Sequence, residues 1–133
     1  MGNPKHDCTV AVINSSEDTV EMLRHALQHA GFTSIVTGHV TEIRDGKLDF
    51  VSYLNEHDPR VLVYDISIPY DQNWTFLKLL MDSQHMRGRT VVVTTTNKRR
   101  LEELVGPTEA LEIVGKPYDL NAIVESVTRA LGA

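Results

Sequence analysis

The chain has 133 residues, of which 41% are hydrophobic, and this length and composition predict one globular domain spanning residues 1–133. Its formal net charge of −5 argues against direct binding to nucleic acid or to an anionic membrane surface. One cysteine excludes an internal disulfide, and neither a signal peptide nor a membrane-spanning apolar stretch is found, so we expect a cytoplasmic protein.

Short apolar runs alternate with segments of helical periodicity along the whole chain. In chain order they predict strand Cys8–Ile13, helix Glu17–Ala30, strand Thr33–Thr37, helix Leu48–His57, strand Arg60–Tyr64, helix Asn73–His85, strand Thr90–Thr94, helix Lys98–Val105, strand Leu111–Val114 and helix Asp119–Leu131. The segment His39–Lys47 contains the turn signal Asp45-Gly46 and is predicted to be a loop.

The first predicted helix illustrates the periodicity. Val20, Leu23 and Leu27 recur at spacings of three and four, which places them on one face. Either Ser15 or Ser16 is suited to cap its amino end. The strands, in contrast, are continuous apolar runs, as expected for parallel strands covered on both faces. Alternating strands and helices therefore predict an α/β fold with right-handed crossovers.

In such a sheet, functional residues gather beyond the carboxyl ends of the strands, where the strand order reverses. The residues at these ends carry polar side chains that we expect to share one crevice: Asn14-Ser15, Asp65, Thr94-Thr95-Thr96 and Lys116. A carboxylate and an ammonium group brought together in this way suggest a site that accepts a phosphoryl group.

Two segments add detail to this pattern. Asp65-Ile-Ser-Ile-Pro69 and Lys116-Pro117-Tyr118-Asp119-Leu120, with a threonine at the end of the fourth strand, resemble the motifs of the CheY-like receiver domain of bacterial response regulators. The resemblance extends from about Thr9 to Leu131. It implies a flavodoxin-like, doubly wound sheet of five parallel strands in the order 2-1-3-4-5, with helices on both faces.

The resemblance also implies roles for individual residues. Asp65 corresponds to the phosphoacceptor, Lys116 to the cation that binds phosphoryl oxygens, and the Lys116–Pro117 bond to a peptide that is usually cis. The phosphoryl-binding threonine is ambiguous, because counting from Asp65 favours Thr95 and counting back from Lys116 favours Thr94; Thr95 is preferred here.

The chain departs from the receiver pattern at the metal site. In the family, two acids at the end of the first strand help to hold a magnesium ion, and here Asn14 and Ser15 stand in their place. Further departures are Gln72-Asn73 in place of an Asp-Gly or Asn-Gly pair, Ile113 in place of an aromatic switch residue, and Pro107 before the fifth strand. We therefore predict no bound metal and no cofactor.

These departures predict an atypical receiver in two-component signal transduction. We expect it to act through contact with a histidine kinase or a downstream effector and not to be an enzyme. Phosphorylation of Asp65 is then impaired or absent. The alternative is a working receiver that is phosphorylated on Asp65 by a histidine kinase with the help of Mg²⁺. A weak homodimer is also predicted, through charges near the fifth strand: Lys98, Arg99, Arg100, Glu112 and Arg129.

Overall fold

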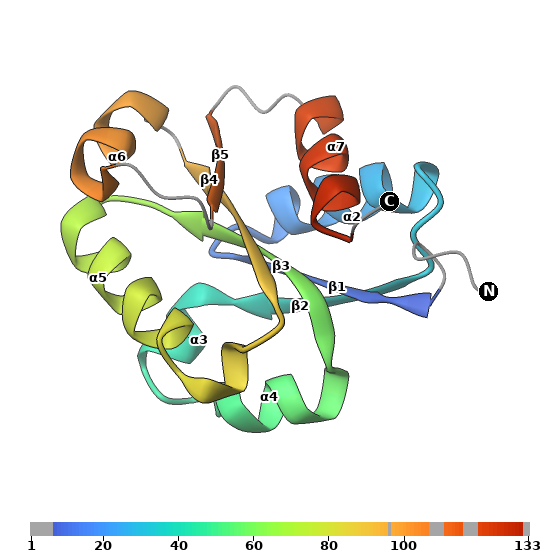
Figure 1. The fold of residues 1–133 in the computed structure, drawn as a ribbon, viewed down its shortest axis with the longest axis horizontal. Coiled ribbons are helices and arrows are strands. Elements are labelled where there is room, and N and C mark those ends of the chain that lie inside the picture. The colour runs from blue at the N-terminus through green and yellow to red at the C-terminus, as the bar shows by residue number, and fades with distance from the viewer. Residues whose placement is uncertain (1–6, 96, 107–110, 116–119, 132–133) are drawn as a thin grey trace.

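A computed structural model describes residues 7–95, 97–106, 111–115 and 120–131, with the backbone alone for residues 111–115. Parallel strands form one sheet in the order β2-β1-β3-β4-β5 (Figure 1). The strands are β1 Thr9–Asn14, β2 Ser34–His39, β3 Pro59–Ile66, β4 Thr90–Thr95 and β5 Leu111–Gly115. The predicted α/β fold with a parallel, flavodoxin-like sheet is confirmed.

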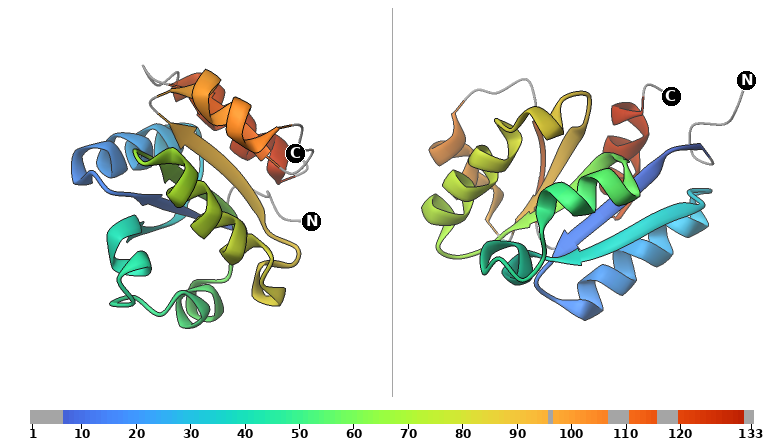
Figure 2. Two further views of the ribbon diagram at one scale, coloured as in Figure 1. Left: turned by 90° about the vertical axis from the view of Figure 1, so that its left-hand side faces the viewer. Right: turned by 90° about the horizontal axis from the view of Figure 1, so that it is seen from below.

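Helices cover both faces of this sheet (Figures 1 and 2). One face carries α2 Glu17–His29 and α7 Leu120–Ala130. The other carries α3 Val40–Arg44, α4 Phe50–His57, α5 Tyr70–Met81 and α6 Lys98–Val105, together with the short 3-10 helix η1 Gln84–Met86. Within the described residues, no helix is long and apolar enough to cross a membrane.

Two apolar cores lie on opposite faces of the sheet, because successive strand residues point to opposite sides. Val12, Val63 and Val92 pack toward α2 and α7, with Val61 and Val10. Their strand neighbours pack toward α3, α4, α5 and α6, and these are Ala11, Ile13, Leu62, Tyr64, Ile66, Val91 and Val93. This alternation also decides which polar side chains share a face at the carboxyl ends of the strands.

The segment predicted to be a loop between the second strand and the second helix contains α3, so that prediction was wrong. Val40 and Ile43 are buried at a spacing of three and anchor this single turn to the core. Two apolar residues give too short a pattern to indicate a helix from sequence alone. The predicted turn itself is present, since the helix ends at Arg44 with Asp45 as its C-cap, and Gly46 has a φ of 77°.

The third helix begins and ends at other residues than the sequence predicted. The helix begins at Tyr70, directly after Pro69, and ends at Met81, whereas the sequence predicted residues 73–85. Proline has a fixed φ and no amide hydrogen, which suits it to the start of a helix. The Ser83 hydroxyl accepts a hydrogen bond from the backbone N–H of His85, which favours the separate 3-10 turn.

Candidate functional site at the carboxyl edge of the sheet

Asp65 and Thr94 form a buried polar pair at the carboxyl edge of the sheet. They are register partners on β3 and β4, so their side chains lie on the same face. The Thr94 hydroxyl donates a hydrogen bond to Asp65 Oδ1 at 2.9 Å. Asp65 is 6% exposed and Thr94 is fully buried, so water screens this interaction little.

Thr95 occupies a different position. It pairs with Ile66, one residue further along both strands, and therefore points to the face opposite Asp65. Its hydroxyl oxygen accepts a long hydrogen bond of 3.4 Å from the backbone N–H of Asn97. The structure thus brings Thr94, not the preferred Thr95, to Asp65. A phosphoryl-binding role for either threonine stays a prediction.

Asn14 lies beside this pair at the end of β1. Because Ile13 is the register partner of Tyr64, Asn14 and Asp65 follow at the same level on adjacent strands. The Asn14 side chain is 3% exposed, and its Oδ1 accepts a hydrogen bond from the Ser16 backbone N–H at 3.0 Å. Within the described part of the chain its buried Nδ2 has no hydrogen-bond partner.

Ser15 and Ser16 have separate roles at the start of α2. Ser15 is exposed, so it does not share the buried position of Asn14. Ser16 is the N-cap of α2, and its hydroxyl oxygen accepts a hydrogen bond from the Thr19 backbone N–H at 3.3 Å. Of the two predicted capping residues, the structure therefore selects Ser16, and of the two residues in place of acids it buries only Asn14.

The predicted partners Lys116 and Pro117 lie outside the described residues, as does Thr96. The predicted position of Lys116 in the same crevice as Asp65 and the cis bond before Pro117 therefore stay predictions. Within the described ranges, the cis peptide bond is Ile68–Pro69, in the loop that connects β3 to α5.

A polar bridge holds the loop that follows Asp65. The buried Asn73 side chain donates from Nδ2 to the Ser67 carbonyl oxygen at 2.7 Å. Arg44 of α3 donates from Nη1 to Asn73 Oδ1 at 3.2 Å. Asn73 stands out in the sequence only as a departure from the receiver pattern, and no role was predicted for Arg44 because its segment was predicted to be a loop.

Burial and the charges of Arg44 and Asp65 affect the pKa of Tyr64, which precedes Asp65. Burial raises the pKa of the Tyr64 hydroxyl to about 12, the nearby positive charge of Arg44 lowers it, and the negative charge of Asp65 raises it further. Burial is the largest of these causes. A neutral tyrosine therefore underlies the site at every physiological pH.

The side chains that the structure describes around Asp65 do not fit a magnesium ion. Magnesium prefers an octahedral set of hard oxygen ligands that usually includes carboxylates. Among the described residues, no group of three or more His, Cys, Asp and Glu side chains is placed to hold a metal. The Asn14 oxygen already accepts a hydrogen bond from Ser16, and the other Asn14 atom that could face the site is a nitrogen.

Known structures share this fold, although no family model and no curated protein matches the chain. A sensor protein from Polaromonas sp. JS666 is 18% identical, with a TM-score of 0.75 over 96% of this chain and 98% of that chain. A signal receiver domain of a two-component histidine kinase from Clostridium thermocellum is 18% identical, with a TM-score of 0.73 over 96% of this chain and 100% of that one.

Chemotaxis response regulator CheY4 of Vibrio cholerae is 20% identical, with a TM-score of 0.66 over 92% of this chain and 98% of that chain. The chain has the fold of a CheY-like receiver domain. The receiver fold accounts for nearly the whole chain, and Asp65 lies at the carboxyl edge of its central strand.

Proposed function

We propose that the chain is an atypical receiver domain in two-component signalling that acts through contact with another signalling protein. Metal-dependent phosphorylation of Asp65 is impaired or absent in this proposal, and the domain is not an enzyme. Its partner is a histidine kinase or a downstream effector, and the site of action is the cytoplasm.

The observation that carries this proposal is the set of groups around Asp65. The carboxylate accepts a hydrogen bond from the neutral Thr94, and the neutral Asn14 lies at the same level of the adjacent strand. A magnesium ion at a phosphoryl-transfer site neutralises charge on the attacking carboxylate and on the phosphoryl oxygens. Without acids to hold the ion, this contribution to the transition state is lost.

A working receiver is the second candidate, and one observation favours it. Asp65 lies near the carboxyl end of β3, with a hydroxyl donor, Thr94, in hydrogen-bond contact. A hydroxyl at that position is suited to stabilise a phosphoryl oxygen after transfer. In this case the carboxylate attacks the phosphorus atom of the donor, and the donor's leaving oxygen carries away the bonding electrons.

Intact-mass measurement after incubation with acetyl phosphate and millimolar magnesium distinguishes the two candidates. We expect no phosphoryl adduct on the parent chain. The double variant Asn14→Asp with Ser15→Asp serves as the positive control, because it restores the acids that the parent lacks. An adduct on the parent that is absent from Asp65→Asn would establish the working receiver and overturn the proposed impairment.

A further inference from the structure

β2 is an outer strand of the sheet, and its second edge is open. The strand pairs with β1 from Ser34 to His39 in one continuous register, and no strand among the described residues pairs with its other side. Figure 2 shows β2 at the margin of the sheet, with α2 on one face. Because the backbone groups of a strand point alternately to its two sides, part of the N–H and C=O groups of β2 can pair with another chain.

β2 lacks the features with which many proteins protect an edge strand. Such edges commonly carry lysine or proline, or are interrupted by a bulge. The segment Ser34–His39 contains no proline, lysine or arginine, and its register with β1 has no bulge. Its residues are half-buried apart from Thr37, which is exposed. The strand is therefore suited to accept an added strand.

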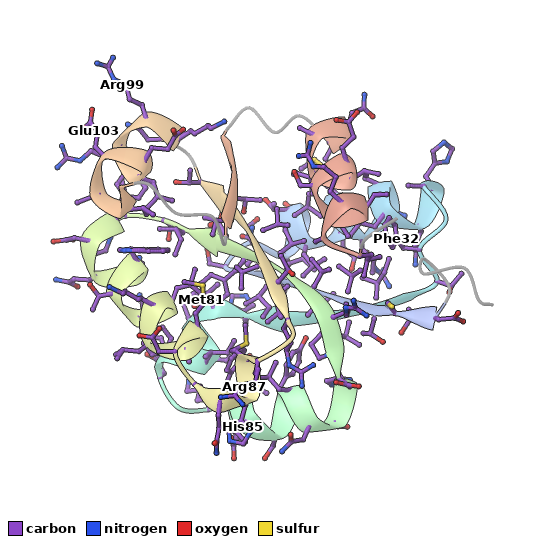
Figure 3. All side chains as sticks on the ribbon, viewed as in Figure 1. Phe32, Met81, His85, Arg87, Arg99 and Glu103 are labelled. Atoms are coloured by element: carbon purple, nitrogen blue, oxygen red, sulfur yellow. The ribbon has the colours of Figure 1, made fainter. Side chains whose placement is uncertain are left out.

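Two contacts hold this edge in place. The Tyr53 hydroxyl donates a hydrogen bond to the Thr37 carbonyl oxygen at 3.1 Å, and this oxygen has a second lone pair for another donor. Phe32, which precedes the strand, is buried in the core shared with α7 (Figure 3). A fixed edge loses little conformational entropy when a second strand pairs with it.

A hollow of about 380 Å³ lies at the carboxyl end of β2, between this strand, α2 and α3. Its lining residues are Glu17, Val20, Glu21, Thr37, Gly38, His39 and Glu42. No lysine or arginine from the described part of the chain lines it. The hollow therefore presents charge of one sign beside the open edge.

Two of its three carboxylates are not neutralised by the described residues. Glu21 pairs with Arg24 on the same helix. Glu17 and Glu42, in contrast, have no ion-pair partner in the described ranges. The guanidinium of Arg44, on the same helix as Glu42, donates toward α5 instead. Glu17 and Glu42 can therefore pair with a cation of a partner.

These charges distinguish between the possible occupants of the edge. A second copy of the chain would offer its own β2, Ser34–His39, which contains no lysine or arginine, and would leave Glu17 and Glu42 without a cation. An extended segment that carries lysine or arginine satisfies both features. Its backbone pairs with β2, and its cations pair with the carboxylates. Charge complementarity thus selects a basic segment of a different protein.

We propose that β2 accepts an extended, basic segment of a partner protein as an added strand. The N–H and C=O groups of the segment pair with the open edge, and a lysine or arginine beside them pairs with Glu17 and Glu42. The inference rests on the proposed contact with another protein and names the surface of that contact. Acetyl phosphate labelling tests Asp65 and peptide binding tests β2, so the two proposals fail in different measurements.

The test uses a synthetic peptide of alternating Thr and Val with a Lys at each end, and a matched peptide with Glu at each end. Each is titrated into the ¹⁵N-labelled chain, and amide chemical shifts are recorded. We expect the Lys peptide to shift the amides of residues 34–39, 17 and 42. The Glu peptide is expected to bind roughly tenfold more weakly, because exposed ion pairs are replaced by repulsion.

A third peptide separates backbone pairing from attraction between charges. It has the sequence of the Lys peptide but is N-methylated at every Thr and Val, so it keeps the cations and lacks the backbone donors of those residues. We expect it to leave the amides of residues 34–39 unshifted, because main-chain hydrogen bonds provide the affinity of an added strand.

Matched variants separate the hollow from the rest of an acidic chain. The variant Glu17→Gln with Glu42→Gln is expected to weaken binding of the Lys peptide by roughly threefold to tenfold. The variant Glu102→Gln with Glu103→Gln is the control, because it removes the same charge from α6. Figure 3 shows Glu103 on the outside of that helix, and neither residue lines the hollow.

Several results overturn the proposal. These are an absence of shifts at residues 34–39 with the Lys peptide, the same shifts with the N-methylated peptide, or an equal loss of affinity in the two Gln variants. Shifts of these amides with protein concentration alone would identify a second copy of the chain as the occupant instead. Dispersed amide spectra of each variant establish that it is folded.

Discussion

The Thr94 hydroxyl donates a 2.9 Å hydrogen bond to the Asp65 carboxylate at the carboxyl edge of the sheet, and both side chains are buried. A charged acceptor strengthens such a bond. Because Asn14 beside it is neutral, the described surroundings of Asp65 add no second negative charge from β1. The domain therefore needs no bound cation to relieve carboxylate repulsion at this edge.

Replacing Thr94 tests the contribution of this contact. Thr94→Val is expected to lower the free energy of unfolding by about 1–3 kcal/mol, because the carboxylate loses a buried donor. Thr95→Val is the matched control, since Thr95 is equally buried but its hydroxyl oxygen only accepts a bond of 3.4 Å from Asn97. Urea denaturation measures the free energy of unfolding of both variants. An equal loss in the two variants would contradict a specific role for the Asp65 contact.

Placing acids at the end of β1 is expected to lower the stability of the domain and to allow it to bind a metal. The variant Asn14→Asp with Ser15→Asp adds negative charge near Asp65, so its thermal midpoint without metal should fall below that of the parent. Millimolar magnesium should raise the midpoint of the variant and leave the parent unchanged. A sub-millimolar, saturable response of the parent that disappears in Asp65→Asn would show that the native site binds the ion.

Alkaline pH is expected to unfold the domain through its buried tyrosines. Burial raises the pKa values of Tyr53 and Tyr64 from 10.0 to about 12. The unfolded chain loses these protons first as pH rises, so the stability associated with their neutral forms is complete below pH 10 and is lost as pH approaches 12. The double variant Tyr53→Phe with Tyr64→Phe should flatten this part of the stability–pH curve.

Circular dichroism across this pH range measures the unfolding of the parent and of the double variant. A comparison of the parent with Tyr53→Phe at neutral pH provides a control. Tyr53 donates its hydroxyl hydrogen to the Thr37 carbonyl oxygen at 3.1 Å. Tyr53→Phe should therefore lower the free energy of unfolding by about 1 kcal/mol at neutral pH. If the double variant shows the same pH dependence as the parent, other groups control alkaline unfolding.

The Asn73 bridge is expected to hold the loop after Asp65. Asn73→Ala leaves the Ser67 carbonyl without this donor, and the free energy of unfolding should fall by about 1–3 kcal/mol. Amide hydrogen exchange at Ile68 should become faster. Asn55→Ala is the control, because Asn55 is exposed on α4, and its effect should stay within about 0.5 kcal/mol.

Weak self-association through α6 and its neighbours is the remaining prediction. Sedimentation over a concentration series should detect a dimer, and the variant Arg99→Glu with Arg100→Glu should abolish it by reversing two charges. The intrahelical pair of Arg99 with Glu103 limits what Arg99 offers to a second copy. Monomer alone at high concentration, or a dimer that the variant retains, would exclude this surface as the interface.

The sequence by itself determined the order of elements and the edge at which polar residues gather. Apolar runs such as Val61–Tyr64 and the spacing of Val20, Leu23 and Leu27 are local patterns, because a buried strand and an amphipathic helix each repeat over a few residues. The alternation of these patterns then implied the parallel sheet. The position of Asp65 at the functional edge followed because it comes directly after the apolar run of its strand.

Only the tertiary structure decided which of these residues meet. The register between β3 and β4 selects Thr94 over Thr95 as the partner of Asp65, and a shift of one residue would have turned the other hydroxyl toward it. The contact between Arg44 and Asn73 and the exposure of Ile68 likewise depend on segments far apart in the chain. Periodicity reports which face of one element is apolar, but the packing of neighbouring elements determines which side chains are paired, buried or left for a partner.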